Sequence, residues 1–137
     1  MAELDAVLGA EYPPEQRHGL SIDELFRPEV RFFVARIGAV AVGCGGVELF
    51  ADYGEVKRMY SRPAVRGKGV GKALLACIEG EARAAGKPVL RLETGTRQAA
   101  AVGLYEAQGF RPCAAFGRYA VMPAQAIATS LFYEKPL

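Results

Sequence analysis

Three alternating glycines and a group of cationic side chains lie in one stretch of the chain, between residues 55 and 74. Gly67, Gly69 and Gly71 are separated from one another by single residues. A packed core does not need three glycines at this spacing. A loop whose backbone N–H groups approach an anion does need them, because a Cβ would obstruct the contact. The pattern therefore predicts an anion-binding loop.

The positive charge of the chain is concentrated around this loop. The sequence has 17 Lys and Arg against 15 Asp and Glu, a net charge of +2. That charge is too small to indicate a nucleic-acid-binding protein through its overall field. Six cations nevertheless lie close together in the sequence: Lys57, Arg58, Arg62, Arg66, Lys68 and Lys72. This grouping favours a small polyanion as the ligand of the loop.

The spacing of the glycines distinguishes three kinds of phosphate-binding loop. A P-loop ends in Gly-Lys-Ser/Thr, but Gly71-Lys72 is followed by Ala73, and Arg66 stands where its first glycine is required. A dinucleotide-binding fingerprint needs a third glycine where this chain has Lys72. The pattern that fits is Arg66-x-x-Gly69-x-Gly71. Its meaning depends on the elements around it.

The surrounding elements follow from hydrophobic periodicity and from turn residues. β-branched and aromatic runs predict strands at 30–37, 39–50, 55–61 and 89–94, with shorter strands near 110–114 and 129–135. Helical spacing predicts helices at 3–10, 70–85 and 97–108. A capping box of Ser21 with Glu24 predicts another short helix that runs to Pro28. The right-handed crossover rule places strand 89–94 parallel to strand 55–61.

Two local features of the predicted strands matter for the site. The glycines at 43, 45 and 46 predict a bulge or bend in strand 39–50. In strand 55–61, strict alternation places Glu55, Lys57, Met59 and Ser61 on one face.

The whole chain is predicted to form one domain, residues 1–137. It has 51% hydrophobic and 23% charged residues, an ordinary globular composition. The predicted order of elements is α-α-β-β-β-α-β-α-β-β. This order indicates an α/β (α+β) fold, with a mixed sheet and a β-loop-α-β unit at its centre.

The remaining composition limits the environment and the ligands of the protein. Cys44, Cys77 and Cys113 are odd in number and lack metal-ligand spacing, so we expect reduced thiols and no metal site. Glu3 and Asp5 interrupt the N-terminus, and no apolar run approaches the length of a membrane span. We therefore expect a cytoplasmic protein that binds neither nucleic acid nor a membrane.

Three stretches, in this order and at these separations, resemble the GNAT superfamily of acetyl-CoA-dependent N-acetyltransferases. Residues 55–60 occupy the place of the family's pantetheine-binding strand. The Arg66-x-x-Gly69-x-Gly71 loop, with the helix behind it, resembles its pyrophosphate loop. Residues 104–110, Leu-Tyr-Glu-Ala-Gln-Gly-Phe, are similar to its Leu-Tyr-Glu-x-x-Gly-Phe signature. The resemblance covers nearly the whole chain and implies the GNAT acyl-CoA N-acyltransferase fold: six to seven strands, about four helices and two splayed central parallel strands.

The resemblance implies acetyl-CoA as co-substrate and assigns a binding role to the loop. The N–H groups of residues 67–73 would bind the pyrophosphate at a helix N-terminus, whose dipole favours an anion. Arg66 and Lys72 would neutralise phosphate, and Arg62 and Lys68 would reach the 3′-phosphate. The backbone of strand 55–61 would bind the pantetheine amides. The implied cofactor-binding residues are Met59, Tyr60, Ser61, Arg66, Gly67, Lys68, Gly69, Val70, Gly71, Lys72, Ala73 and Gln98; Gln98 stands where many members have asparagine.

The resemblance also implies two catalytic residues. An alkylammonium has a pKa of about 10.4, so a base must accept a proton before the amine attacks. Glu55 resembles the carboxylate that some members use through water; the other interpretation is an exposed strand-end glutamate in an ion pair. Glu93 and then His18 are further candidates. Tyr105 would protonate the departing CoA thiolate or hydrogen-bond its sulfur, unless it only packs in its helix.

The implied reaction transfers acetyl to a primary amine of a small molecule or amino acid by direct attack in a ternary complex. A protein lysine or N-terminus is an alternative acceptor, and a non-catalytic acyl-CoA-binding module is a third interpretation. Exposed-looking aromatic loops at residues 12–14 and 116–119 would cover the acceptor, or would be ordinary loop packing. The resemblance also allows a homodimer, because many members form one.

Overall fold

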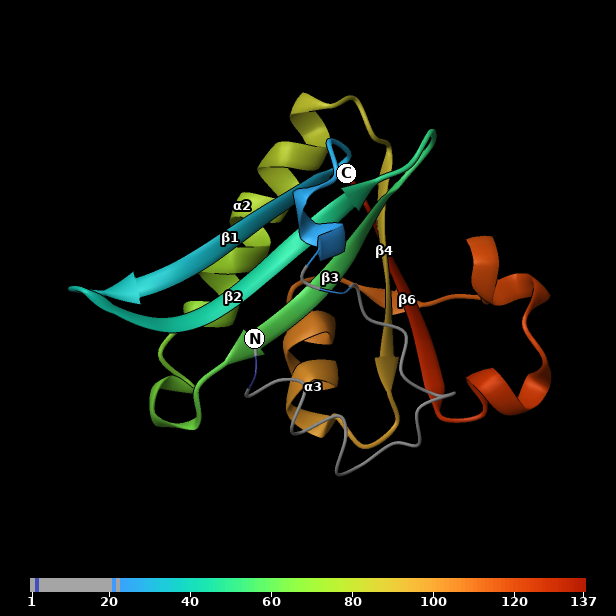
Figure 1. The fold of residues 1–137 in the computed structure, drawn as a ribbon. Helices are drawn as coiled ribbons and strands as arrows, with labels where there is room; N and C mark the ends of the chain where they lie inside the picture. The colour runs from blue at the N-terminus through green and yellow to red at the C-terminus, as the bar shows by residue number, and fades with distance from the viewer. Residues whose placement is uncertain (1, 3–20, 22) are drawn as a thin grey trace.

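A six-stranded mixed sheet forms the frame of the molecule (Figure 1). The computed structural model describes residues 2, 21 and 23–137, and the predicted helix at 3–10 lies outside them. The strands are β1 (Val30–Ile37), β2 (Val40–Leu49), β3 (Gly54–Ser61), β4 (Val89–Gly95), β5 (Arg111–Pro112) and β6 (Ser130–Pro136), in the spatial order β1-β2-β3-β4-β6-β5. Only β3 and β4 pair in parallel. The predicted strands and the parallel central pair are confirmed.

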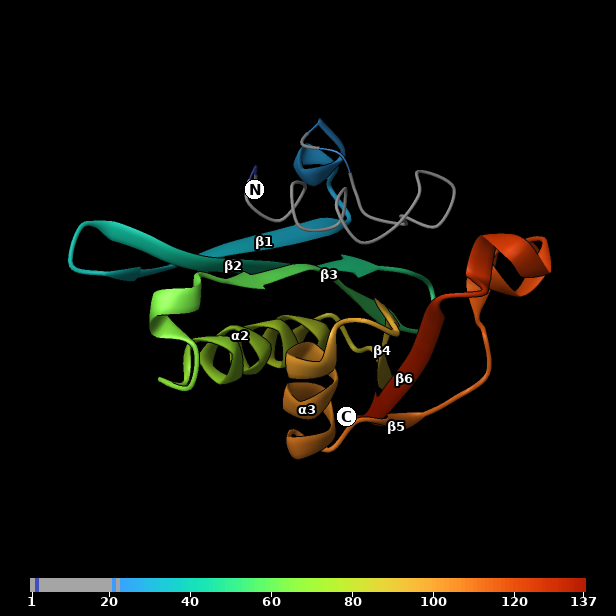
Figure 2. The same cartoon turned by 90° about the horizontal axis from the view of Figure 1, so that it is seen from below.

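Two α-helices, α2 (Val70–Ala84) and α3 (Ala99–Ala107), lie on the same face of the sheet (Figure 2). They are the α-helices of residues 23–137, where about four helices were predicted for the whole chain. The predicted capping box is present: the Ser21 N–H donates to Glu24 Oε1 at 3.0 Å, and the Glu24 N–H donates to Ser21 Oγ at 3.2 Å. It opens only the 3₁₀ turn η2 (Asp23–Phe26). The prediction of an α-helix there was wrong, because Pro28 follows too soon for a longer helix.

The two faces of the sheet are packed differently. On the face towards α2 and α3, Val47 and Val56 join Ile78 and Leu90 in an aliphatic core. The other face carries a smaller aromatic cluster of Tyr53, Phe116 and Tyr119, with Phe132 packed against it. The last part of that cluster comes from the 3₁₀ turn η4 (Gly117–Val121). Polar groups on the second face therefore lie beside an aromatic cluster and outside the aliphatic core.

A β-bulge interrupts β3 in its middle. Lys57 lies opposite Gly46 and Tyr60 lies opposite Cys44, so Arg58 and Met59 together face one residue of β2, Gly45. Arg58 has a φ of 58°, the left-handed conformation that such a bulge uses. A Cβ on Gly45 would overlap the Met59 sulfur, which explains a glycine at this point. The irregularity predicted at the β2 glycines is present, but the extra residue opposite Gly45 belongs to β3 and not to β2.

The bulge changes which face the second half of β3 presents. Up to Lys57 the alternation holds, and Glu55 and Lys57 share the face of Tyr119. After the extra residue, Met59 packs instead with the core on the α2 face. The prediction that Glu55 and Met59 share a face was therefore wrong.

The central parallel strands separate soon after they begin. Only Gly54 with Leu90, and Glu55 with Arg91, are paired between β3 and β4. Beyond these pairs the two strands diverge towards their C-terminal ends (Figure 1). Within residues 23–137, the β4-facing edge of β3 from Val56 onwards has no partner strand. The splay implied by the resemblance is present.

Candidate active site

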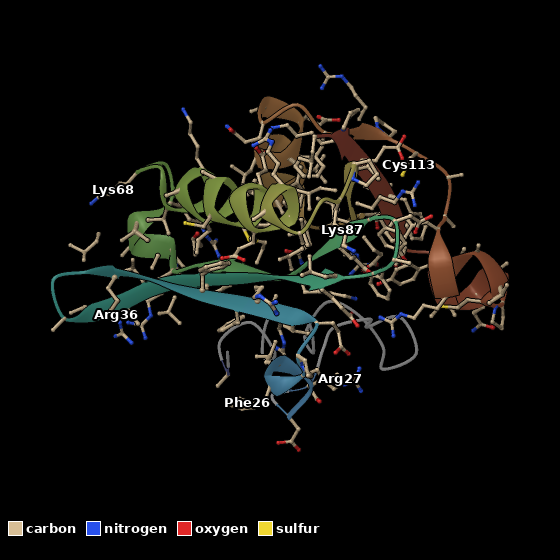
Figure 3. The ribbon with its side chains drawn as sticks, turned by 90° about the horizontal axis from the view of Figure 1, so that it is seen from above. Phe26, Arg27, Arg36, Lys68, Lys87 and Cys113 are labelled. Atoms are coloured by element: carbon tan, nitrogen blue, oxygen red, sulfur yellow. The ribbon has the colours of Figure 1, made fainter. Side chains whose placement is uncertain are left out.

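A pocket of about 440 Å³ lies where β3, the glycine loop, α2 and α3 meet. It is lined by Met59, Tyr60, Ser61, Val65, Arg66, Gly67, Gly69, Val70, Gly71, Lys72, Gln98, Ala100, Ala101, Leu104 and Tyr105. Most residues assigned to the cofactor from sequence are in this lining, and so is Tyr105. Lys68, Ala73 and Glu55 are not. Figure 3 shows Lys68 extending outward from the loop, away from the rest of the molecule.

Sequence reasoning missed the apolar wall of the pocket. Val65, Leu104 and two alanines of α3, Ala100 and Ala101, complete the lining. Leu104 belongs to the Leu-Tyr-Glu-x-x-Gly-Phe stretch and could have been found there. Nothing in the alanine run of α3 indicates which of its members face the cavity.

The first turn of α2 presents unsatisfied backbone donors. Gly69 is the N-cap, and no side chain caps the helix. The Ala73 N–H donates to the Gly69 carbonyl at 3.0 Å, so it is used within the helix. For the N–H groups of Val70, Gly71 and Lys72, the described part of the chain contains no hydrogen-bond acceptor. With the helix dipole, these groups form a site for an anion.

The three glycines of the loop serve two different purposes. Gly67 and Gly69 have φ angles of +82° and +84°, which side chains rarely adopt, although nothing lies within 4 Å of a Cβ built on either. They are required by backbone conformation. Gly71 is helical, and its Cβ would stand 2.6 Å from a methyl carbon of Leu104. It is required by the close approach of α2 to α3.

The predicted cations stand at the rim of the pocket. The Arg66 Nε donates to the Ser61 carbonyl at 3.1 Å, and its guanidinium lies 5.8 Å from the centre of the Tyr60 ring. This contact holds Arg66 across the pocket entrance. Arg66 and Lys72 are both exposed, so water already solvates them and they can pair with an anion at little desolvation cost.

Tyr105 is the buried hydroxyl of the pocket. Its side chain is only 5% exposed and packs edge-on against Phe110, with ring centres 5.7 Å apart. Burial raises the pKa of Tyr105, and the charge of Glu93 raises it further. The phenol therefore stays protonated and acts as a donor. No hydrogen-bond acceptor for this hydroxyl is found in the described part of the protein.

Glu55 belongs to a buried polar network on the opposite face of the sheet. Its Oε2 lies 2.9 Å from Lys57 Nζ and accepts a 2.6 Å hydrogen bond from the Tyr119 hydroxyl. The Lys57 Nζ also donates to the Tyr119 oxygen at 3.0 Å. Glu55 is 2% exposed, so the interpretation as an exposed strand-end glutamate was wrong. The ion pair of that interpretation is nevertheless present, and its partner is Lys57.

The aromatic loop at 116–119 differs from its prediction. Phe116 and Tyr119 looked exposed in the sequence but are 7% and 1% exposed. They pack edge-on with ring centres 5.3 Å apart, and Arg118 donates to the Tyr119 hydroxyl at 3.3 Å. Burial and the Glu55 charge raise the pKa of Tyr119, which keeps it a donor to that carboxylate. This loop therefore braces Glu55.

Of the two other predicted base candidates, the structure describes Glu93. Glu93 is half-buried on β4 and accepts a 2.7 Å hydrogen bond from the Ser130 hydroxyl. His18, and the aromatic and proline residues 12–14, lie outside the described residues.

The cysteines and the acidic side chains form no metal centre in the described ranges. Cys44, Cys77 and Cys113 are free thiols, and the buried Cys44 donates to the Arg58 carbonyl at 3.3 Å. No group of three or more His, Cys, Asp or Glu side chains there could hold a metal ion. Across the same ranges, the helices are too short or too polar to cross a membrane.

A splayed parallel pair, an uncapped glycine loop and a pocket between them define the class of acyl-CoA-binding acyltransferases. The comparisons agree: residues 2–110 match the acetyltransferase (GNAT) family. The chain belongs to this family and is an acetyltransferase. The chain is 47% identical to an IAA acetyltransferase of Azospirillum brasilense, over 98% of this chain and 86% of the relative.

Solved structures support the same fold. A Klebsiella pneumoniae protein assigned as an acyl-CoA N-acyltransferase has a TM-score of 0.76 at 36% identity, over 99% of this chain and 86% of that one. The PaiA N-acetyltransferase of Thermoplasma acidophilum, solved with coenzyme A, has a TM-score of 0.67 at 21% identity. That likeness covers 80% of this chain and 62% of the other, and it concerns the fold alone.

Proposed function

We propose that the protein transfers the acetyl group of acetyl-CoA to a primary amine of a small molecule or an amino acid, by direct attack in a ternary complex. One observation carries the proposal. A single pocket contains both the unsatisfied N–H groups at the start of α2 and the buried hydroxyl of Tyr105. The first set is suited to a pyrophosphate, and the second to a departing sulfur.

The binding of acetyl-CoA follows from the loop and from the unpaired edge of β3. The pyrophosphate is held by the N–H groups of Val70, Gly71 and Lys72, with Arg66 and the Lys72 side chain at the rim. Pantetheine amides bond to the backbone of Met59, Tyr60 and Ser61, in the way that an added strand would. The splay of β3 from β4 supplies the space for this strand-like contact.

In the proposed reaction, the acceptor ammonium first loses one proton to the base. The amine nitrogen then attacks the acetyl carbon, a C–N bond forms and the C–S bond breaks. The nitrogen loses its second proton, and CoA leaves as a thiolate that takes up a proton from solvent. A backbone N–H near Met59 stabilises the oxyanion of the intermediate. Tyr105 acts at the sulfur. A thiol has a pKa of about 8.5 and a tyrosine about 10. Because burial raises the pKa of Tyr105 further, complete proton transfer is uphill, and hydrogen-bond donation is the favoured role.

The proton from the amine goes to Glu55 through water, with Glu93 as the alternative. Glu55 is held in place by its ion pair with Lys57 and by the hydrogen bond from the Tyr119 hydroxyl. Glu93 is the carboxylate whose charge acts on Tyr105. Glu55→Gln and Glu93→Gln separate them: the variant that loses the base lowers kcat and removes the acidic limb of the pH–rate profile.

The acceptor is tested with a panel of alkylamines, amino acids, a lysine-containing peptide and IAA, which the name of the 47% identical relative suggests. A thiol reagent follows CoA release, and calorimetry measures acetyl-CoA binding. We expect micromolar binding and turnover with a small amine. Binding without any turnover would indicate a non-catalytic module, turnover of the peptide alone would indicate a protein acceptor, and no binding would refute the proposal. Light scattering on the same sample tests a homodimer.

A further inference from the structure

A second glutamate stands beside Glu55 on the polar face of the sheet. Glu48 of β2 lies directly opposite Glu55 of β3 in the antiparallel register. Directly opposed residues share a face, with Cβ atoms roughly 5 Å apart. The preceding pair, Val47 with Val56, points into the core on the α2 side. Glu48 therefore points away from the core, towards the face that carries Glu55, Lys57 and Tyr119.

The two carboxylates differ in how they are satisfied. Glu55 accepts a hydrogen bond from Tyr119 and forms an ion pair with Lys57. Glu48 is buried to a similar degree, at 8% exposed. Yet no hydrogen bond or ion pair joins its side chain to another described residue, and its carboxylate oxygens are not sealed from solvent. The charges of Lys57 and Arg118 lower its pKa through space, without a direct contact.

This arrangement is costly for a residue with a purely structural role. A directly opposed like charge is destabilising in an antiparallel pair. A carboxylate on a largely buried residue also loses part of its hydration, and burial accordingly raises the pKa of Glu48. A glutamine or an apolar residue would avoid both costs. The unpaired carboxylate therefore indicates a group that is absent from the free protein and carries positive charge.

The chemistry of the surroundings selects the kind of cation. In this part of the sheet Glu48 and Glu55 are accompanied by the ammonium of Lys57, and no third acidic ligand completes a metal site within the described ranges. An alkylammonium needs only one carboxylate and neighbouring acceptors. Amine acceptors arrive in this form, because their pKa is about 10.4.

We propose that Glu48 binds the ammonium group of the acceptor beside Glu55 and so selects cationic amines. This inference rests on the proposed N-acetyltransferase function. Glu48 holds the charged acceptor before it loses its proton, and it takes no part in the departure of the thiol. Its contribution is therefore to acceptor binding, whereas Tyr105 contributes to the chemical step.

The test compares Glu48→Gln with the wild-type protein on whichever alkylamine or amino acid of the panel is acetylated fastest. A hydrogen bond to a charged group contributes roughly 1.5–3 kcal/mol, so we expect KM for the amine to rise about 10- to 100-fold. The kcat value and the Kd of acetyl-CoA should change less than threefold. Glu134→Gln is the matched control, because Glu134 is a part-exposed strand glutamate already paired with Arg91. Its KM should equal that of the wild type.

The failure of this inference is separable from failure of the function. If the wild type acetylates amines and Glu48→Gln does so with an unchanged KM, Glu48 does not bind the acceptor. If KM rises only because the variant unfolds, its thermal midpoint falls and acetyl-CoA binding weakens too, which assigns Glu48 a structural role and refutes the inference. If the wild type binds acetyl-CoA but acetylates no amine, the proposed function fails first.

Discussion

Tyr105 is the residue whose removal most directly tests the chemistry. Its hydroxyl faces the pocket, and the ring is packed by Phe110. In Tyr105→Phe the ring packing remains and only the donor at the sulfur is lost. We expect kcat to fall about 100-fold, within the range for one acid–base group, with the Kd of acetyl-CoA unchanged. Steady-state kinetics and calorimetry measure the two quantities.

Tyr133→Phe is the control for this prediction. Tyr133 belongs to the same core cluster, but its hydroxyl donates to Glu106 at 3.0 Å. Its kcat should stay within a factor of two or three of the wild type. Equal losses in the two variants would show that Tyr105 acts through packing alone.

Glu48 gives a prediction about pH and stability. Burial raises the pKa of this carboxyl above its usual 4.5, so ionising it costs more in the folded protein than in the unfolded chain. The ionised form opposes folding, and this penalty grows as the pH rises through the folded-state pKa. Glu48→Gln should therefore have a higher free energy of unfolding than the wild type at pH 7. The difference should vanish below pH 4.5.

Urea denaturation at a series of pH values measures this difference. A variant less stable than the wild type at pH 7 would show that the Glu48 carboxylate stabilises the fold.

Among single residues, sequence analysis identifies those that lie inside a motif. It misses those that come into contact only in the folded structure. The loop glycines and Tyr105 were found because their spacing is local. Tyr119 braces Glu55 from 64 positions away, and no periodicity connects them. Glu48 was missed because a strand glutamate looks exposed until its register is known.

The contact between α2 and α3 predicts opposite effects of alanine at two glycines of α2. Gly71 and Gly80 are both helical glycines of α2, but only Gly71 lies against another element. In Gly71→Ala the new methyl displaces Leu104, which lines the pocket. We expect a loss of about 1–3 kcal/mol in stability and weaker acetyl-CoA binding. Gly80→Ala should instead gain about 0.5–1 kcal/mol, because alanine favours the helix.

Urea unfolding and calorimetry on both variants measure these opposite effects. A stable Gly71→Ala with normal binding would show that the spacing of the two helices is not critical. At this scale, periodicity predicted each strand and both helices within a residue or two. It did not predict the face reversal within β3, because a bulge depends on the partner strand.

When acetyl-CoA binds, the backbone should gain protection mainly where β3 and β4 diverge. The free edge of β3 and the first turn of α2 are the two backbone regions expected to gain partners. Hydrogen exchange should therefore slow at residues 56–61 and 67–72, with little change in β1. A ligand at 100 times its Kd also adds about 2.7 kcal/mol to the free energy of unfolding. Protection spread evenly over all strands would contradict a local site.

The topology of the whole molecule was largely predictable, because crossover handedness and the order of elements allow few arrangements. The splay was expected only through family resemblance; periodicity contains no information about how far two strands diverge. The covering of the polar face was also unpredictable, since the 116–119 loop reads as exposed and yet supplies buried rings.

The extra residue in β3 decides which face of the sheet the later side chains of that strand point to. If β3 ran through Arg58 with regular alternation, Arg58 would turn towards the helices and Met59 would meet the Glu55–Lys57 pair. Because the bulge fits Arg58 and Met59 opposite the single residue Gly45, Met59 reaches the α2 face instead. One strand thus sends a carboxylate to one side of the sheet and a pocket-lining methionine to the other, although the two positions are an even number of residues apart.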